Sequence, residues 1–112
     1  LLRFLAALRA TGPAYVLLTD GTDGAWLAGL EGVIWRASLP AEVAGTAGAG
    51  DAFTSTLGAA LAEGLKPADA TLEASANAAS VVSAVDTTTG LLTRQALDTR
   101  LAALAPEPPL TF

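Results

Sequence analysis

The segment Gly45-Thr46-Ala47-Gly48-Ala49-Gly50-Asp51 places three glycines and an acid directly before a run of small and apolar residues at helical spacing, 52–64. Glycines permit unusual backbone angles and let a ligand come close to the main chain. The free N–H groups in the first turn of a helix, with the helix dipole behind them, attract anions. We therefore expect an anion-binding turn at the start of this helix.

The spacing of these glycines excludes the two commonest phosphate motifs. A dinucleotide fingerprint requires Gly-x-Gly-x-x-Gly. Here the order of the gaps is reversed, because the glycines at 45, 48 and 50 form Gly-x-x-Gly-x-Gly. A P-loop ends in Lys followed by Ser or Thr, whereas Asp51 and Ala52 follow the last glycine here. The turn therefore fits neither motif.

Asp51 is an unexpected residue in an anion site, because a carboxylate repels phosphate. It suits the role of a general base that accepts the proton of an attacking hydroxyl, since phosphoryl transfer needs positioning, charge neutralisation and one proton acceptor. The amides of Gly48, Ala49 and Gly50 would then stabilise charge on the transferring group. The alternative is an Asp that only caps the helix at 52–64, and the residues alone leave both interpretations open.

Apolar periodicity predicts the elements that precede this turn. Leu1, Leu5 and Leu8 share one helical face, and Gly12-Pro13 would end that helix. We predict strands at 15–19, at 25–28 and at 33–39, the first of them buried on both faces. Turn residues occupy 20–24. Trp26 and Trp35 are predicted to pack on the strands, as fillers of the core or of an interface.

The second half of the chain reads as helices rich in small residues. Pro67 suits the first position of a helix that runs through Asn77 to about Val85. Thr93 can cap a last helix, and the prolines at 106, 108 and 109 are predicted to end the ordered chain. Strands followed by such helices predict an α/β protein with helices packed on a sheet.

Composition narrows the class of protein. The 112 residues suit one domain, and 52% hydrophobic with 15% charged residues indicates a globular chain. A net charge of −5 with scattered basic residues argues against nucleic-acid binding. Cysteine and histidine are absent, which removes thiolate and Ser-His chemistry and most zinc sites. No apolar run approaches the ~20 residues of a membrane span, so we expect a soluble, cytoplasmic protein without membrane partners.

Three segments resemble the ribokinase-like, PfkB-type carbohydrate kinases. Residues 46–53, Thr-Ala-Gly-Ala-Gly-Asp-Ala-Phe, resemble the C-terminal Gly-Ala-Gly-Asp signature of that family. Residues 15–25 resemble its strand and Thr-x-Gly-x-x-Gly nucleotide-contact turn, and the 32-residue separation of Thr19 and Asp51 suits the family. Residues 76–79, Ala-Asn-Ala-Ala, more weakly resemble a helix that flanks the adenine site in relatives.

The resemblance implies the C-terminal part of a three-layer α/β/α fold, with 1–112 as its ATP-binding and catalytic-base portion and the substrate and lid portion outside the chain. It implies ATP-dependent phosphorylation of a sugar, a nucleoside or a related alcohol. Asp51 would be the catalytic base and Gly48–Asp51 the anion hole. Thr19, Gly21 and Gly24 would contact the ATP phosphates or ribose. Asn77 would lie near the nucleobase, with a satisfied mid-helix amide as the alternative.

The resemblance also implies that Mg²⁺ arrives with ATP, because no residue is a convincing metal ligand and Asp86 is predicted to be a solvated helix end. Gly45 stands where the family usually has Asp or Asn, and 86–90 only loosely resembles the second cation-side loop, so dependence on a monovalent cation is left open. A homodimer is compatible with this pattern. Because Leu1 already lies within a structured pattern, we expect a piece of a longer protein. The alternative is a stand-alone nucleotide-binding or structural module without turnover.

Overall fold

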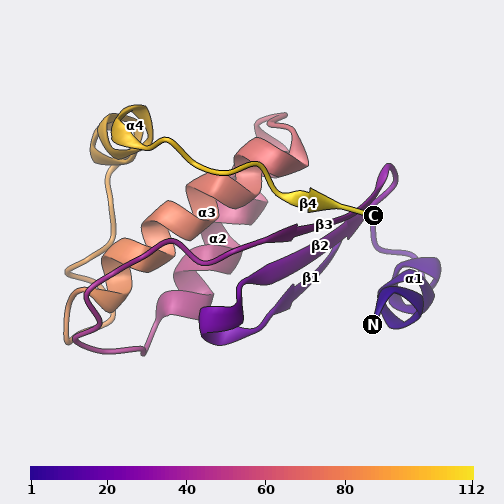
Figure 1. Cartoon of the computed structure of the whole chain (residues 1–112), viewed down its shortest axis with the longest axis horizontal. Coiled ribbons are helices and arrows are strands. Elements are labelled where there is room, and N and C mark those ends of the chain that lie inside the picture. Colours follow the sequence, from indigo (N-terminus) through magenta and orange to yellow (C-terminus); the bar gives the residue numbers. More distant parts are fainter.

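The computed structural model describes all 112 residues and contains one four-stranded sheet and four α-helices (Figure 1). The elements follow one another as α1 (Leu2–Ala10), β1 (Val16–Thr19), β2 (Ala25–Gly29), β3 (Gly32–Arg36), α2 (Ala49–Ala62), α3 (Pro67–Val82), α4 (Arg94–Ala103) and β4 (Leu110–Thr111). A single 3₁₀ turn, η1 (Gly21–Asp23), joins β1 to β2. This order of elements matches the α/β class expected from the sequence.

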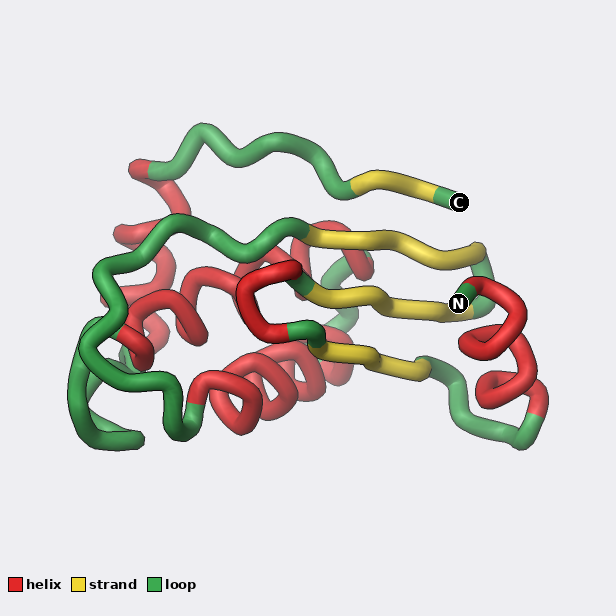
Figure 2. The backbone as a smooth tube through the Cα atoms, turned by 60° about the horizontal axis from the view of Figure 1, so that its bottom comes forward, coloured by secondary structure: helices red, strands yellow, loops and turns green.

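The sheet has the strand order β1-β2-β3-β4, and every neighbouring pair is antiparallel. Leu17 lies opposite Leu27, which lies opposite Ile34. Residues directly opposite each other share a face of the sheet, and these three pack against the side of α2 and α3. Figure 2 shows the four strands side by side with these helices behind them. One face of the sheet is therefore covered by helices.

The hydrophobic core lies between this face and the two central helices. Small residues dominate it, so α2 and α3 can approach each other closely, and the larger side chains Leu27, Phe53 and Leu57 fill the space that remains. Burying a leucine of this kind stabilises the fold by roughly 1.5–3 kcal/mol. The buried members are Ala25, Leu27, Phe53, Leu57, Ala60, Ala70 and Ala74.

The opposite face of the sheet carries an aromatic cluster. The rings of Trp26 and Trp35 lie 6.3 Å apart between centroids, and Trp26 lies 5.4 Å from Phe112. The indole N–H of Trp35 donates to the carbonyl oxygen of Asp23 at 3.0 Å, while Phe112 is 56% exposed. Helix α1 lies against β1 and β2, beside the end of the sheet where β2 turns into β3 (Figure 2), and its Leu5 is buried. The two tryptophans thus pack on the strands, as expected.

Several boundaries differ from those expected. β1 is an edge strand and only half-buried, because a single neighbour, β2, pairs with it. β3 ends at Arg36, three residues early, and α3 ends at Val82. Helix α2 begins at Ala49 and includes Gly50, although glycine is a poor helix former.

The prediction that the prolines end the ordered chain is wrong. Residues 110–112 return to the sheet, where Leu110 lies opposite Trp35 and the N–H of Phe112 donates to the carbonyl oxygen of Val33 at 2.9 Å. This partner strand lies far away in sequence, so local patterns could not indicate the pairing. The sheet consequently places both ends of the chain in the same region (Figure 1).

Two arginines link segments that are distant in sequence. The buried guanidinium of Arg36 donates to the carbonyl oxygens of Ala68 at 2.7 Å and Glu107 at 2.9 Å, and Arg36 Nε lies 3.4 Å from the hydroxyl of Thr71. Burial lowers the pKa of Arg36, and the charge of Asp69 opposes this shift. On the other side of α3, Arg94 donates to both carboxylate oxygens of the buried Glu73, at 3.0 and 3.2 Å. α3 is thereby tied to β3, to the C-terminal segment and to α4.

Candidate active site

The N-terminus of α2 is shaped by Gly48. This residue is the N-cap, with φ 86° and ψ −9°, a left-handed conformation that glycine adopts without steric penalty. A Cβ atom at Gly48 would lie 3.0 Å from the Cβ of Thr87, which belongs to the loop after α3. Both the backbone angle and this close approach therefore require glycine at position 48.

The amides of this turn are left open. Gly48 supplies no side-chain cap, and the N–H of Ala49 reaches the carbonyl oxygen of Thr46 only at 3.5 Å. The N–H groups of Gly50 and Asp51 have no acceptor within the protein. Unpaired donors at a helix N-terminus, reinforced by the helix dipole, favour a bound anion. The amides of Gly50 and Asp51 are therefore open, and the role of this turn as an anion site stays a prediction.

Asp51 lies in the first turn of α2 and is exposed. Its carboxylate takes part in no hydrogen bond or ion pair, while its main-chain carbonyl accepts a hydrogen bond from the Ser55 hydroxyl at 2.8 Å. The N-cap position belongs to Gly48, and no side chain caps the helix there. Asp51 is thus not a hydrogen-bonded cap, and its carboxylate is available to another group.

A cavity of about 520 Å³ opens beside this turn. Its wall is formed by the β1–β2 connection, the end of β3 with the loop that follows, the start of α2 and one face of α3. Of the predicted site residues, five line it: Thr19, Gly21, Gly24, Ala49 and Gly50. Gly48, Asp51 and Asn77 do not line it, although Gly48 and Asp51 directly flank the two residues of α2 that do. The fold therefore brings the two glycine motifs together at one cavity.

The backbone conformation and its close packing explain why residue 24 is a glycine. Its φ of 95° is left-handed, and a Cβ atom there would collide with the carbonyl oxygen of Arg36 on the neighbouring strand. The N–H of Asp20 donates to the carbonyl oxygen of Gly24 at 2.9 Å and closes the turn. Backbone packing alone thus accounts for glycine at 24, and its contact with a nucleotide stays a prediction.

Asn77 is engaged on both sides of its amide. Its Nδ2 donates to the hydroxyl of Thr56 at 2.9 Å, and its Oδ1 accepts the N–H of Leu92 at 3.0 Å. The residue is 8% exposed, and the neighbouring Ala78 and Ala79 line the cavity in its place. The structure therefore gives Asn77 the satisfied mid-helix arrangement, and a position near a nucleobase stays a prediction.

The loop after α3 packs against the glycine turn. Asp86 lies beyond the end of α3, in an exposed turn, so its prediction as a helix end is wrong. Its carboxylate accepts the N–H groups of Thr88 and Thr89, at 2.9 and 2.6 Å, and the Thr89 hydroxyl. These bonds, that of the Thr89 hydroxyl first, lower its pKa to about 2. Gly45 donates its N–H to the carbonyl oxygen of Val82 at 3.2 Å and contributes no side chain to the cation-side loop.

The residues present do not fit a protein-held metal ion. No group of three or more His, Cys, Asp or Glu side chains comes together in the structure.

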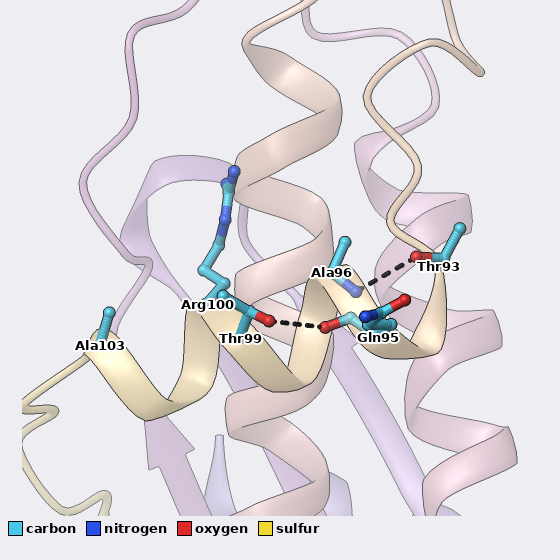
Figure 3. A pocket seen from close by; sticks show the side chains of 6 residues that line it. All are labelled: Thr93, Gln95, Ala96, Thr99, Arg100 and Ala103. Atoms are coloured by element: carbon cyan, nitrogen blue, oxygen red, sulfur yellow. Dashed lines mark hydrogen bonds between the residues drawn. The ribbon is translucent and has the colours of Figure 1, made fainter.

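Sequence reasoning missed Arg36 and Ser75, which also line the cavity. A lone charged residue at the end of an apolar strand could have indicated Arg36, whereas nothing marks Ser75 among the small residues around it. A second hollow, of about 570 Å³, lies along α4 and is lined by Thr93 and five residues of that helix (Figure 3). None of the predicted site residues borders it.

The start of α2 thus places open amides and a free carboxylate beside a cavity in an α/β framework. The chain belongs to the pfkB family of carbohydrate kinases, because the model of that family matches residues 1–94. No match was found among the curated proteins.

Solved structures show the same fold. Ribokinase from Thermotoga maritima has a TM-score of 0.80 at 22% identity, over 90% of this chain and 34% of its own. Ribokinase from Arabidopsis thaliana, in complex with ribose and ATP, has a TM-score of 0.81 at 26% identity, over 92% and 33%. A nucleoside kinase from Burkholderia thailandensis, in complex with inosine, has a TM-score of 0.79 at 26% identity, over 91% and 34%.

The chain thus spans about a third of the length of the structures that it resembles. The ribokinase-like fold expected from the sequence is confirmed. None of the helices combines the length and the hydrophobicity that crossing a membrane requires.

Proposed function

We propose that the protein carrying this chain transfers a phosphoryl group from ATP to a hydroxyl of a small molecule, a sugar or a nucleoside. The observation that carries the proposal is the start of α2, where unpaired amides and an unpaired carboxylate flank a cavity shared with the β1–β2 turn. Two of the similar structures support this substrate class, since one contains ribose with ATP and the other contains inosine.

Asp51 would take the proton from the acceptor hydroxyl as the oxygen attacks the terminal phosphorus. The bond from that phosphorus to the bridging oxygen breaks, ADP leaves with the electron pair, and the proton stays on the carboxylate until solvent removes it. An exposed carboxylate without partners is suited to this exchange. The amides of Gly48, Ala49 and Gly50 would stabilise the negative charge on the transferring group.

The cavity would hold the nucleotide. Its volume of about 520 Å³ falls in the range of small-molecule sites, ~300–1,000 Å³. Thr19, Gly21 and Gly24 would contact the phosphates or the ribose from the β1–β2 side. Mg²⁺ bound to the phosphates would neutralise charge, and the present residues offer it no built site.

Residues 1–112 would then be the ATP-binding and catalytic-base portion of a ribokinase-like domain. The acceptor would be held by other parts of such a domain, because the chain covers only a third of the similar structures. The second candidate is a nucleotide-binding module without turnover, and the same short coverage favours it for the 112 residues in isolation.

A substrate panel separates the two candidates. The protein expressed from its complete reading frame is mixed with ATP, Mg²⁺ and single pentoses, hexoses or nucleosides, and ADP formation is recorded. We expect ADP formation that depends on one class of acceptor. Nucleotide binding with no acceptor-dependent ADP across the panel would favour the binding module. A protein that binds no nucleotide would overturn both.

A further inference from the structure

The polar side chains that line the cavity are of two kinds only. Five are hydroxyls and one is a guanidinium: Thr19, Thr22, Ser38, Thr46, Ser75 and Arg36. No carboxylate and no amide side chain faces the cavity. The Arg36 guanidinium already donates to three protein acceptors, and the Ser38 hydroxyl donates to the carbonyl oxygen of Gly21 at 3.0 Å.

This inventory bears on how a nucleobase could be distinguished. Adenine and guanine present opposite donors and acceptors at the same ring positions. An ionised carboxylate can only accept hydrogen bonds and a guanidinium can only donate them, so either group favours one base over the other. A hydroxyl can rotate to donate or to accept a hydrogen bond and therefore fits both bases. Sites that select strongly do so by leaving fixed polar groups unpaired with the wrong ligand. The Arg36 guanidinium already has three protein acceptors, so the hydroxyls are the polar side chains of this wall that remain to meet a base.

Ser75 differs from the other hydroxyls in being buried. Only 5% of the residue is exposed, and it lines the cavity from α3. The hydroxyl of Thr71, one turn earlier, lies 2.9 Å from the carbonyl oxygen of Pro67, whereas the Ser75 hydroxyl has no partner within the protein. Arg9 Nε is the only buried side-chain polar atom without a partner, so the Ser75 oxygen is itself accessible, and the residue lines the cavity.

The position of Ser75 along α3 indicates which part of a nucleotide it would meet. Val82, at the end of α3, accepts the N–H groups of Ala44 and Gly45, at 2.8 and 3.2 Å, and so lies beside the glycine turn. Ser75 precedes it by seven residues, about 10 Å along the helix axis. With phosphates at the glycine turn, Ser75 lies on the side of the nucleoside.

We propose that the cavity binds purine nucleoside triphosphates with little discrimination between adenine and guanine, and that the Ser75 hydroxyl gives the nucleoside a buried hydrogen bond. This inference rests on the proposed function, because it takes the cavity to be the nucleotide site. The protein would then select its phosphoryl donor by the phosphates and the sugar, and not by the base.

Competition binding tests the proposal. A fluorescent N-methylanthraniloyl-ATP is bound to the protein from its complete reading frame and displaced by ATP, GTP or ITP. We expect dissociation constants that agree within about fivefold, since no fixed polar side chain separates the bases. A preference for ATP over GTP beyond about 50-fold would overturn weak discrimination and leave the proposed kinase function intact. Failure of all three to displace the probe would overturn the proposed function as well.

Variants at Ser75 test its role. Ser75→Ala should weaken ATP, GTP and ITP by the same factor, about two- to tenfold, because one hydrogen bond is lost. Ser75→Cys, nearly equal in size with a weaker donor, should show the same direction and guards against a folding defect in the alanine variant. Ser80→Ala is the matched control, since Ser80 lies on the same helix, is equally buried at 5% and does not line the cavity. Unchanged affinities in both Ser75 variants would overturn the assignment of this hydroxyl.

Discussion

The two helices α2 and α4 begin in opposite ways. At α4, the Thr93 side chain accepts the N–H of Ala96 at 3.1 Å and closes the first turn (Figure 3). At α2, Gly48 has no side chain to offer, and the N–H groups of Gly50 and Asp51 stay unpaired. A Thr or Ser cap stabilises a helix by about 1 kcal/mol. A helix start without such a cap leaves donors free for a ligand, whereas Thr93 satisfies one donor of α4 within the protein.

The largest expected effect concerns the carboxylate at the open start. Asp51→Asn should lower the rate of phosphoryl transfer by about 10²–10⁴-fold, because an amide cannot accept the proton. Nucleotide affinity should stay within about threefold, because the cavity wall is unchanged. Steady-state ADP formation and competition binding measure the two quantities.

Asp98→Asn provides the control for that variant. Asp98 is an exposed acid on the capped helix α4, where it pairs with Arg94 at 3.2 Å. Its loss should leave the rate unchanged. A near-normal rate in Asp51→Asn, or an equal loss in both variants, would contradict the role of Asp51.

The next effect concerns the glycine that keeps the start of α2 open. Gly48→Ala forces a side chain into a left-handed conformation, at about 1–2 kcal/mol, and against Thr87. The free energy of unfolding in urea and the affinity for ATP should both fall. Gly58→Ala, on the same helix with nothing near its added Cβ, should instead stabilise the protein by about 0.5–1 kcal/mol. Equal effects of the two substitutions would contradict the requirement for glycine at position 48.

A smaller effect is expected at the capped start. Thr93→Ala should lower the free energy of unfolding by about 1 kcal/mol, since the Ala96 N–H loses its acceptor. Thr93→Ser, which keeps the hydroxyl, should restore most of that loss. Turnover should be unaffected by either change, and a marked loss of turnover in the serine variant would break the distinction between the two helix starts.

The smallest effect concerns the loop that faces Gly48. The pKa of Asp86 is lowered to about 2 in the folded protein, so its turn stabilises the fold above the ordinary carboxyl pKa and loses this contribution as pH falls toward 2. The midpoint of thermal unfolding of the wild type should therefore exceed that of Asp86→Ala at pH 6. The difference should shrink between about pH 4 and pH 2. A difference independent of pH would show that the ionised carboxylate does not hold this turn.

Local sequence signals predicted the parts of this molecule that local chemistry decides. Pro67 at the first position of α3 and Thr93 as a cap are found as expected, because each acts on its own helix. The meeting of Thr19 with Gly50 at one cavity was indicated only by family resemblance.

What escaped prediction depends on partners distant in sequence. β4 forms because β3 offers a free edge, and Arg36 is buried because carbonyl oxygens of α3 and of the C-terminal segment surround it. Ser75 became a candidate only when its neighbours on α3 were seen to line the cavity. No periodicity in the chain carries this information.

The bond from Arg36 to the carbonyl oxygen of Glu107 joins residues 71 positions apart. Because closing a long loop loses more chain entropy than closing a short one, we expect this contact to form after the β1–β2 and β2–β3 hairpins during folding. Since Arg36 also borders the cavity, one side chain connects the cavity wall to the segment that leads into β4.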